Sequence, residues 1–194
     1  MSWMSWTFPT KPIDLGERVQ ALDESGYIME LPEWKTIHTP GHSPGHVSLF
    51  FKLNATLIAG DALATTKVES AFYALSFAQK LSGPPKFLTT DWAAAAQSVR
   101  KLQELEPRII AAGHGYAMRG KEMQVALNNL ADNFEDIAIP ESGRYVQVPA
   151  QADEHGVEYV PPQMPSVRYS AVAVGLLSMA ISFFAVREVQ KRFL

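Results

Sequence analysis

Cysteine is absent from all 194 residues of the sequence. This absence excludes disulfide bonds, thiolate zinc sites and a cysteine nucleophile. It fits a reducing compartment, so we expect a cytoplasmic protein. The chain also lacks a cluster of basic residues, because its 17 Lys and Arg are scattered and its formal net charge is −3. No nucleic-acid partner is therefore expected.

The two ends of the chain lack different features. Residues 1–6 have no positively charged stretch and no apolar core, so no secretory signal is expected there. Residues 169–186 carry no charge over 18 positions, and Arg187, Lys191 and Arg192 follow them. A helix of this length spans roughly 27 Å, close to the hydrocarbon thickness of a bilayer. Two interpretations stay open: a membrane anchor, and an apolar helix packed against the protein or a partner.

Apolar runs bounded by turn residues predict strands, and apolar residues at a helical period predict helices. The chain is 47% hydrophobic and 19% charged, as folded globular proteins are. Residues 69–81 fit neither period. Residues 141–167 are polar and proline-punctuated, which predicts an extended arm or linker. The expected strands are 34–38, 47–51, 56–59 and 109–112, and the expected helices are about 91–105, capped by Thr90 or Asp91, and about 123–137.

Two histidines and an aspartate stand in turns at the ends of predicted strands. His42 follows a strand and a Thr-Pro-Gly turn, Asp61 closes a hairpin, and His114 lies between two glycines after a strand. Residues at the carboxyl ends of strands converge on one edge of a sheet. Imidazole and carboxylate together suit zinc, iron or manganese. Each histidine alone is more often a solvated or hydrogen-bonded residue than a metal ligand.

The joint pattern is more specific than its parts. Thr-Pro-Gly-His-Ser-Pro-Gly-His over residues 39–46 precedes Leu-Ile-Ala-Gly-Asp over 57–61, and Ala-Gly-His-Gly follows over 112–115. These strings resemble the third, fourth and fifth motifs of the metallo-beta-lactamase superfamily, in the same order. The resemblance covers about residues 30–140. It implies an α/β fold, namely one α/β half of that family's αββα sandwich.

The resemblance implies a role for each residue of the motifs. His42 would bind one metal, His114 would bind a second, and Asp61 would bridge both as the catalytic carboxylate. The metal would be a divalent ion, with zinc expected first and iron or manganese as alternatives. His46 would support the ligands through a hydrogen bond.

One motif of the family is missing from this sequence. No His-x-His-x-Asp-His string occurs, and His38 and His155 stand in contexts that suit structural or solvent-facing residues. Three ligands spread over two metals are fewer than the three protein ligands that a catalytic zinc ordinarily has. We therefore expect this chain to be catalytically incomplete by itself. The expected organisation is a partial domain over 1–140, a proline-rich arm over 141–167 and an apolar helix over 168–194.

Half of a sandwich would leave one face of its sheet exposed. Val47, Leu49 and Phe51 alternate along one predicted strand and would lie on that face. An apolar patch of this size needs a cover. Three covers stay open: a missing N-terminal portion, a separate N-terminal polypeptide, and self-association into a homo-oligomer.

The function that the resemblance implies is metal-dependent hydrolysis of a small-molecule ester, thioester or lactone. Residues 62–85 would line the substrate pocket. Four apolar side chains of this segment would favour a partly hydrophobic substrate, unless they are core residues. They are Phe72, Tyr73, Leu75 and Phe77. The alternative is a non-catalytic binding protein derived from the same fold, dependent on a partner or tethered to a membrane.

Overall fold

The structure is a computed structural model, and it describes residues 15–19, 21–23, 25–76, 78–153 and 155–163. The chain divides into two units, Met1–Pro162 and Gln163–Leu194. The described helices and strands lie in the first unit. Among the described residues, no helix is long and apolar enough to cross a membrane. The apolar segment 169–186 lies outside those residues.

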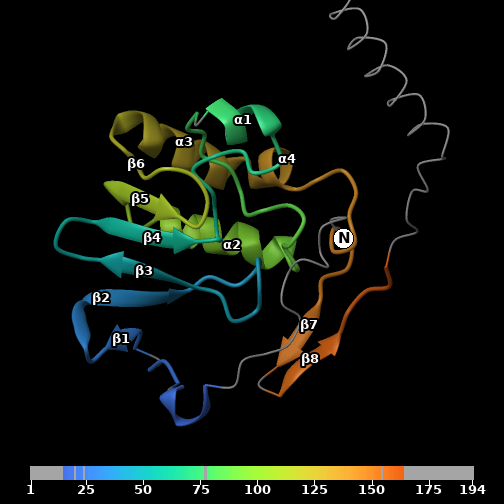
Figure 1. The fold of residues 1–194 in the computed structure, drawn as a ribbon, viewed down its shortest axis with the longest axis horizontal. Helices are drawn as coiled ribbons and strands as arrows, with labels where there is room; N and C mark the ends of the chain where they lie inside the picture. Colours follow the sequence, from blue (N-terminus) through green and yellow to red (C-terminus); the bar gives the residue numbers. More distant parts are fainter. Residues whose placement is uncertain (1–14, 20, 24, 77, 154, 164–194) are drawn as a thin grey trace, which may run out of the picture. The chain divides into compact units, whose positions relative to one another are not determined.

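A six-stranded sheet forms the centre of the first unit, with its strands in chain order (Figure 1). Neighbouring strands are antiparallel except for the fourth and fifth, which are parallel and joined by a helical crossover. The strands are β1 (Tyr27–Ile28), β2 (Leu31–His38), β3 (Val47–Phe51), β4 (Thr56–Gly60), β5 (Ile109–Ala112) and β6 (Met118–Arg119).

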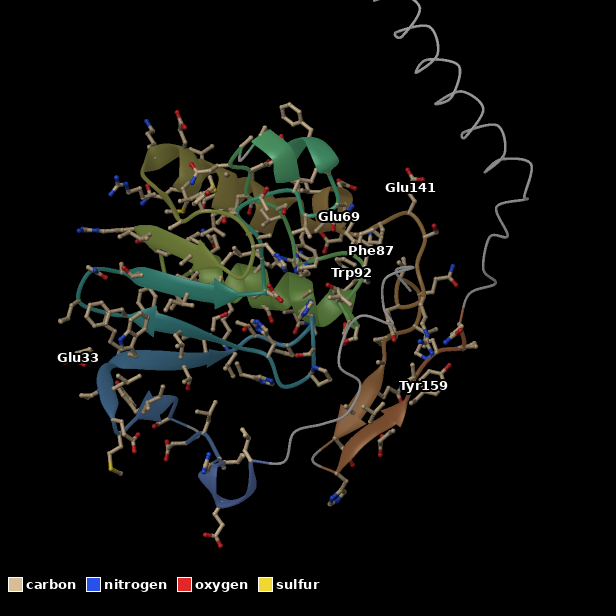
Figure 2. All side chains as sticks on the ribbon, viewed as in Figure 1. Glu33, Glu69, Phe87, Trp92, Glu141 and Tyr159 are labelled. Carbon is tan, nitrogen blue, oxygen red and sulfur yellow. The ribbon has the colours of Figure 1, made fainter. Side chains whose placement is uncertain are left out.

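The helices α2 (Trp92–Gln103), α3 (Lys121–Asp132) and α4 (Phe134–Ala138) pack against one face of this sheet. A short helix, α1 (Ala71–Ser76), lies between β4 and β5 along the chain, and a 3-10 turn (Gly16–Arg18) precedes β1. Leu57 and Ile110 on the strands share one core with Val99 of α2 and Leu127 of α3. Trp92, labelled in Figure 2, packs its ring against Phe134 with 6.5 Å between centroids. The mixed α/β fold is as predicted.

The opposite face of the sheet carries the alternate residues of the same strands. Leu49 pairs with Ile58, and Ile58 pairs with Ala111, so these side chains form a row across three strands. Ile58 is 39% exposed. Leu49 and Phe51 are half-buried, and the Phe51 ring lies 5.0 Å from that of Trp34. This row is named the open face below.

The helix expected over about 123–137 is two helices instead of one. Asn133 leaves the helical conformation, with φ −122° and ψ 35°, and separates α3 from α4. Its side-chain amide donates to the Asn129 carbonyl at 3.2 Å. Asparagine side chains compete in this way with the backbone for hydrogen bonds and interrupt helices. Phe134 and Ala138 nevertheless stay buried in the core.

Two segments contain structure that their sequence patterns did not predict. Residues 69–81 include the short helix α1, and the pair Ala64 and Ser82 forms a bridge across this segment. The arm beginning at residue 141 contains a hairpin of β7 (Gln151–Asp153) and β8 (Gly156–Tyr159), where Tyr159 is labelled in Figure 2. Its strands are short and exposed at every residue, so they lack the alternation of buried and exposed residues that identifies a strand.

Candidate metal centre

One edge of the sheet gathers the three candidate ligands. The carboxyl ends of β4 and β5 are neighbours, because Gly60 pairs with Ala112 in the parallel register. Asp61 therefore emerges beside the loop that carries His114. The turn after β2 reaches the same edge, since β2 runs antiparallel to β3 and β3 antiparallel to β4. His42 lies in that turn.

The Asp61 carboxylate lies between the two imidazoles. Its Oδ2 is 3.5 Å from His42 Nε2, and its Oδ1 is 3.6 Å from His114 Nε2. The side chains of His42, Asp61 and His114 are 15%, 30% and 45% exposed. The structure thus brings together the three residues that the sequence motifs predicted as ligands. One side of the cluster is exposed to solvent.

The turn of His42 is held by the start of α2. The Gly41 carbonyl accepts hydrogen bonds from the backbone N–H groups of Thr90, at 3.0 Å, and Asp91, at 2.9 Å. Gly41 has φ +134°, and a Cβ there would lie 2.5 Å from the Ala95 backbone. Only glycine permits both this conformation and this close approach. The Thr-Pro-Gly-His turn is therefore fixed against the helix.

His46 holds the backbone of Asp61. Its Nε2 accepts a hydrogen bond from the Asp61 N–H at 3.0 Å, and its Nδ1 lies 2.8 Å from Thr39 Oγ1 and 3.2 Å from the Thr39 carbonyl. Because Nε2 accepts, we assign the proton to Nδ1. Gly60 has φ +57°, and a Cβ there would lie 2.6 Å from His46 Nε2. The absence of a side chain at Gly60 therefore leaves room for the His46 imidazole.

Burial lowers the pKa of both histidines of the turn. For His42 the loss of hydration outweighs the opposing influence of the Asp61 charge. For His46 the loss of hydration also dominates, against the hydrogen bond to Thr39. Both rings are consequently held in the neutral form at neutral pH. Metal ligation requires that form of histidine.

Two buried polar atoms of the cluster make no hydrogen bond, namely His42 Nδ1 and Asp61 Oδ1. Buried polar atoms are otherwise almost always paired, since leaving one without a partner is costly. An unpaired carboxylate oxygen facing imidazoles suits a cation. In the described part of the chain, however, no three His, Asp or Glu side chains are arranged to hold one ion.

The other two histidines have different surroundings. His38 is exposed and its Nε2 lies 2.8 Å from the Pro44 carbonyl. His155 is exposed in the turn of the β7–β8 hairpin, where its backbone N–H donates to Asp153 Oδ1 at 2.8 Å. Neither forms an ion pair with Asp61 among the residues that the structure describes.

A pocket of about 380 Å³ adjoins His114. Of the four apolar side chains expected to line it, Tyr73 does so. Phe72 is exposed, and the side chains of Leu75 and Phe77 lie outside the described parts. Lys67 lies within the segment 62–85 that was expected to line the pocket, whereas Tyr116 lines it without having been predicted, because no local motif marks that residue. The lining residues are Thr66, Lys67, Val68, Tyr73, Ala78, His114, Gly115 and Tyr116.

The fold and the histidine–aspartate cluster define a class of protein. The family model described as the metallo-beta-lactamase superfamily matches residues 3–114. The chain belongs to the metallo-beta-lactamase superfamily.

Curated relatives come from Bacillus subtilis (strain 168). The chain is 43% identical over 134 residues to the protein named "Probable metallo-hydrolase YflN", a match that covers 69% of this chain and 51% of YflN. It is 31% identical over 77 residues to "Probable metallo-hydrolase YybB", covering 40% of this chain and 30% of YybB. The chain thus spans about half, or less, of the length of these relatives.

Solved structures also resemble the chain. One is TTHA1623, whose structure is described as di-iron-bound: it is 25% identical, with a TM-score of 0.41, over 65% of this chain and 51% of that chain. Another is the BLEG-1 B3 metallo-beta-lactamase, which is 27% identical, with a TM-score of 0.36, over 51% of this chain and 38% of that chain.

Proposed function

We propose that this chain is the C-terminal part of a metal-dependent hydrolase that acts on esters, thioesters or lactones. The observation that carries the proposal is the Asp61 carboxylate lying 3.5 Å and 3.6 Å from two imidazoles, with one buried oxygen making no hydrogen bond. Membership of the superfamily supports it. So do the names of YflN and YybB as probable metallo-hydrolases.

The chain's own residues would hold the metals. His42 would bind one ion, His114 the other, and Asp61 both, while His46 keeps the Asp61 backbone in place. Zinc is the ion that we propose, since neutral imidazole and carboxylate suit it, and iron and manganese are the alternatives. When bound, such ions activate water as a nucleophile at neutral pH and stabilise negative charge that develops on the substrate.

The pocket beside His114 would receive the substrate. Tyr73 and Val68 offer apolar surface, and Lys67 and His114 offer polar groups at the same pocket. Ligand sites commonly combine an apolar lining with a few polar groups that orient the ligand. A partly hydrophobic acyl group in this pocket would present its carbonyl carbon toward the Asp61 cluster.

The remaining ligands would come from a second α/β unit. A catalytic zinc ordinarily has three protein ligands and an open position, whereas this chain offers each metal one histidine and a shared aspartate. The open face of the sheet, with Ile58 exposed between Leu49 and Ala111, would pack against that second unit. Together they would form an αββα sandwich whose other half carries the His-x-His-x-Asp-His motif.

Hydrolysis assays test the proposed function. The purified chain, supplied with zinc and mixed with a polypeptide that carries the missing motif, should hydrolyse one of a panel of chromogenic esters, thioesters and lactones. Asp61→Asn should reduce kcat/KM at least a thousandfold. His155→Gln, in the exposed hairpin turn, serves as the control and should leave kcat/KM unchanged. Hydrolysis that survives Asp61→Asn would refute the proposal, as would inactivity on every substrate.

A further inference from the structure

Thr65 makes two hydrogen bonds to a single carbonyl, that of His114. Its backbone N–H donates to the His114 oxygen at 3.0 Å and its Oγ1 donates to the same oxygen at 2.9 Å. Thr65 is fully buried, so water does not compete for these bonds. We propose that Thr65 is a positioning residue of the metal centre, which fixes His114 where its ring faces Asp61. This inference rests on the proposed function, because it concerns a ligand of the proposed metal pair.

Thr65 is itself held firmly. The residue before it, Ala64, exchanges backbone hydrogen bonds of 3.0 Å and 2.9 Å with Ser82. The Thr65 carbonyl accepts a third bond from the Lys80 N–H at 3.1 Å. A hydrogen-bonded bridge across the segment therefore leaves Thr65 little freedom to follow a moving loop. The threonine can act as a fixed support for His114.

The loop of His114 lies directly on Thr65. Gly115 has φ +93°, and a Cβ there would lie 2.5 Å from Thr65 Oγ1. Glycine at this position thus serves the contact with Thr65 as well as the left-handed backbone. A second tie joins the same two segments, since Gln79 Nε2 donates to the Ala117 carbonyl at 2.9 Å.

This arrangement ties two proposed ligands to one segment. Asp61 and Thr65 are four residues apart in the turn that follows β4, and His114 comes 49 residues after Thr65 along the chain. The position of His114 relative to Asp61 is set by Thr65 across that sequence distance. The pocket lies against the same contact, because Thr66 and Gly115 both line it.

Amide hydrogen exchange in the metal-free chain tests the proposal. Thr65→Val keeps the shape of the side chain and the backbone bond but removes the hydroxyl. The protection factor of the residue 65 amide should fall about tenfold, the effect expected from losing a neighbouring buried hydrogen bond. Thr65→Ser restores the hydroxyl and should restore protection to within about twofold of the wild type.

Thr89→Val is the matched control. Thr89 is also buried, and its Oγ1 donates to the Pro85 carbonyl at 2.8 Å, outside the His114 loop. Thr89→Val should leave the protection factor of the residue 65 amide unchanged once the exchange rates are corrected for global stability. Gly115→Ala is an independent variant that presses a methyl against Thr65 and should reproduce the local loss. Equal losses in Thr65→Val and Thr89→Val would overturn the proposal, as would unaltered protection in Thr65→Val and Gly115→Ala.

Zinc affinity gives a second measurement. Thr65→Val should weaken zinc binding about tenfold, a typical effect of removing a group that orients a metal ligand, and Thr65→Ser should recover it. The proposed metal site fails if the wild-type chain, mixed with a polypeptide that carries the missing motif, does not bind zinc, whatever the exchange data show. The proposal for Thr65 fails if zinc binds equally well to the wild type and to Thr65→Val. The two failures are therefore distinguishable.

Discussion

At the scale of single residues, the candidate metal centre depends on places where backbone lies against polar side chains. A Cβ on Gly113 would collide with Asp61 Oδ1. The backbone N–H of the same glycine donates to the Gly60 carbonyl at 2.8 Å. Gly113 of the Gly-His motif therefore makes room for the carboxylate of the Gly-Asp motif, and its backbone bonds the two motifs directly.

Substitution of Gly113 tests this contact. In Gly113→Ala the added methyl should displace the Asp61 carboxylate and lower zinc affinity at least tenfold. Gly143→Ala, a glycine of the arm without a left-handed backbone, should leave zinc affinity unchanged. Competition with a chromogenic zinc chelator measures both variants. Equal zinc affinities in Gly113→Ala and the wild type would show that the carboxylate can move without consequence.

Acidification should destabilise the metal-free chain through His42 and His46. Burial depresses the pKa of both rings in the folded state below the ordinary value of 6.5. As the pH falls below about 6.5, the unfolded chain therefore takes up protons before the folded chain does, and the free energy of unfolding decreases. Urea unfolding in the presence of a chelator, between pH 7.5 and pH 5, should show this decrease.

His46→Gln isolates one of the two contributions to that pH dependence. It should flatten the decrease over the same window, whereas His155→Gln, in an exposed turn, should not. A free energy of unfolding that is constant or rises on acidification would be inconsistent with two buried neutral rings.

The motif residues could be predicted from the sequence, whereas the residues that hold them in place could not. His42, Asp61 and His114 lie in short strings with a known order, so the pattern nominated them as a group. Thr65 and Tyr116 lie outside such strings. Their roles come from contacts across long stretches of chain, as between Thr65 and His114. Local patterns contain no record of such contacts.

At the scale of elements, strands and helices with a buried face were predictable. The hairpin of β3 and β4 and the strand β5 lie where the apolar runs predicted them. Predictions failed where an element has little buried surface or where a side chain competes with the backbone. The exposed hairpin of β7 and β8 is an example of the first, and the break at Asn133 is an example of the second.

The cap of α2 gives a prediction at this scale. Asp91 is the N-cap, and its Oδ1 accepts a hydrogen bond from the Ala94 N–H at 2.9 Å. Asp91→Ala should lower the free energy of unfolding by about 1 kcal/mol. Asp132→Ala, at the end of α3, removes a carboxylate that caps nothing and should change stability by less than about 0.5 kcal/mol. Chemical denaturation distinguishes the two, and equal effects would contradict the assignment of the cap.

At the scale of the whole molecule, the open face determines what the chain needs around it. The sheet buries its other face under helices, while Ile58 stays 39% exposed beside Leu49 and Phe51. We propose that a second α/β unit covers this row, and that a second copy of the chain does so when that unit is absent. Apolar rows of this kind mark contact surfaces.

Light scattering after gel filtration tests the proposed contact. The isolated wild-type chain should self-associate, and Ile58→Lys should raise the dissociation constant at least tenfold, because the new charge would be buried without a partner. Leu53→Lys places the same charge in the turn of the same hairpin, where the side chain is 78% exposed, and should leave association unchanged. A monomeric wild-type chain, or equal association in the Ile58→Lys variant, would contradict the proposal.

Zinc titration followed by NMR of the histidine rings tests the central proposal most directly. The proposed pair of sites predicts that zinc shifts the ring resonances of His42 and His114, leaves His155 unaffected, and loses both shifts in Asp61→Ala. Shifts that persist in Asp61→Ala would contradict a metal centre organised around this carboxylate. Titration with no shift at either ring, in the presence of a polypeptide that carries the missing motif, would contradict it as well.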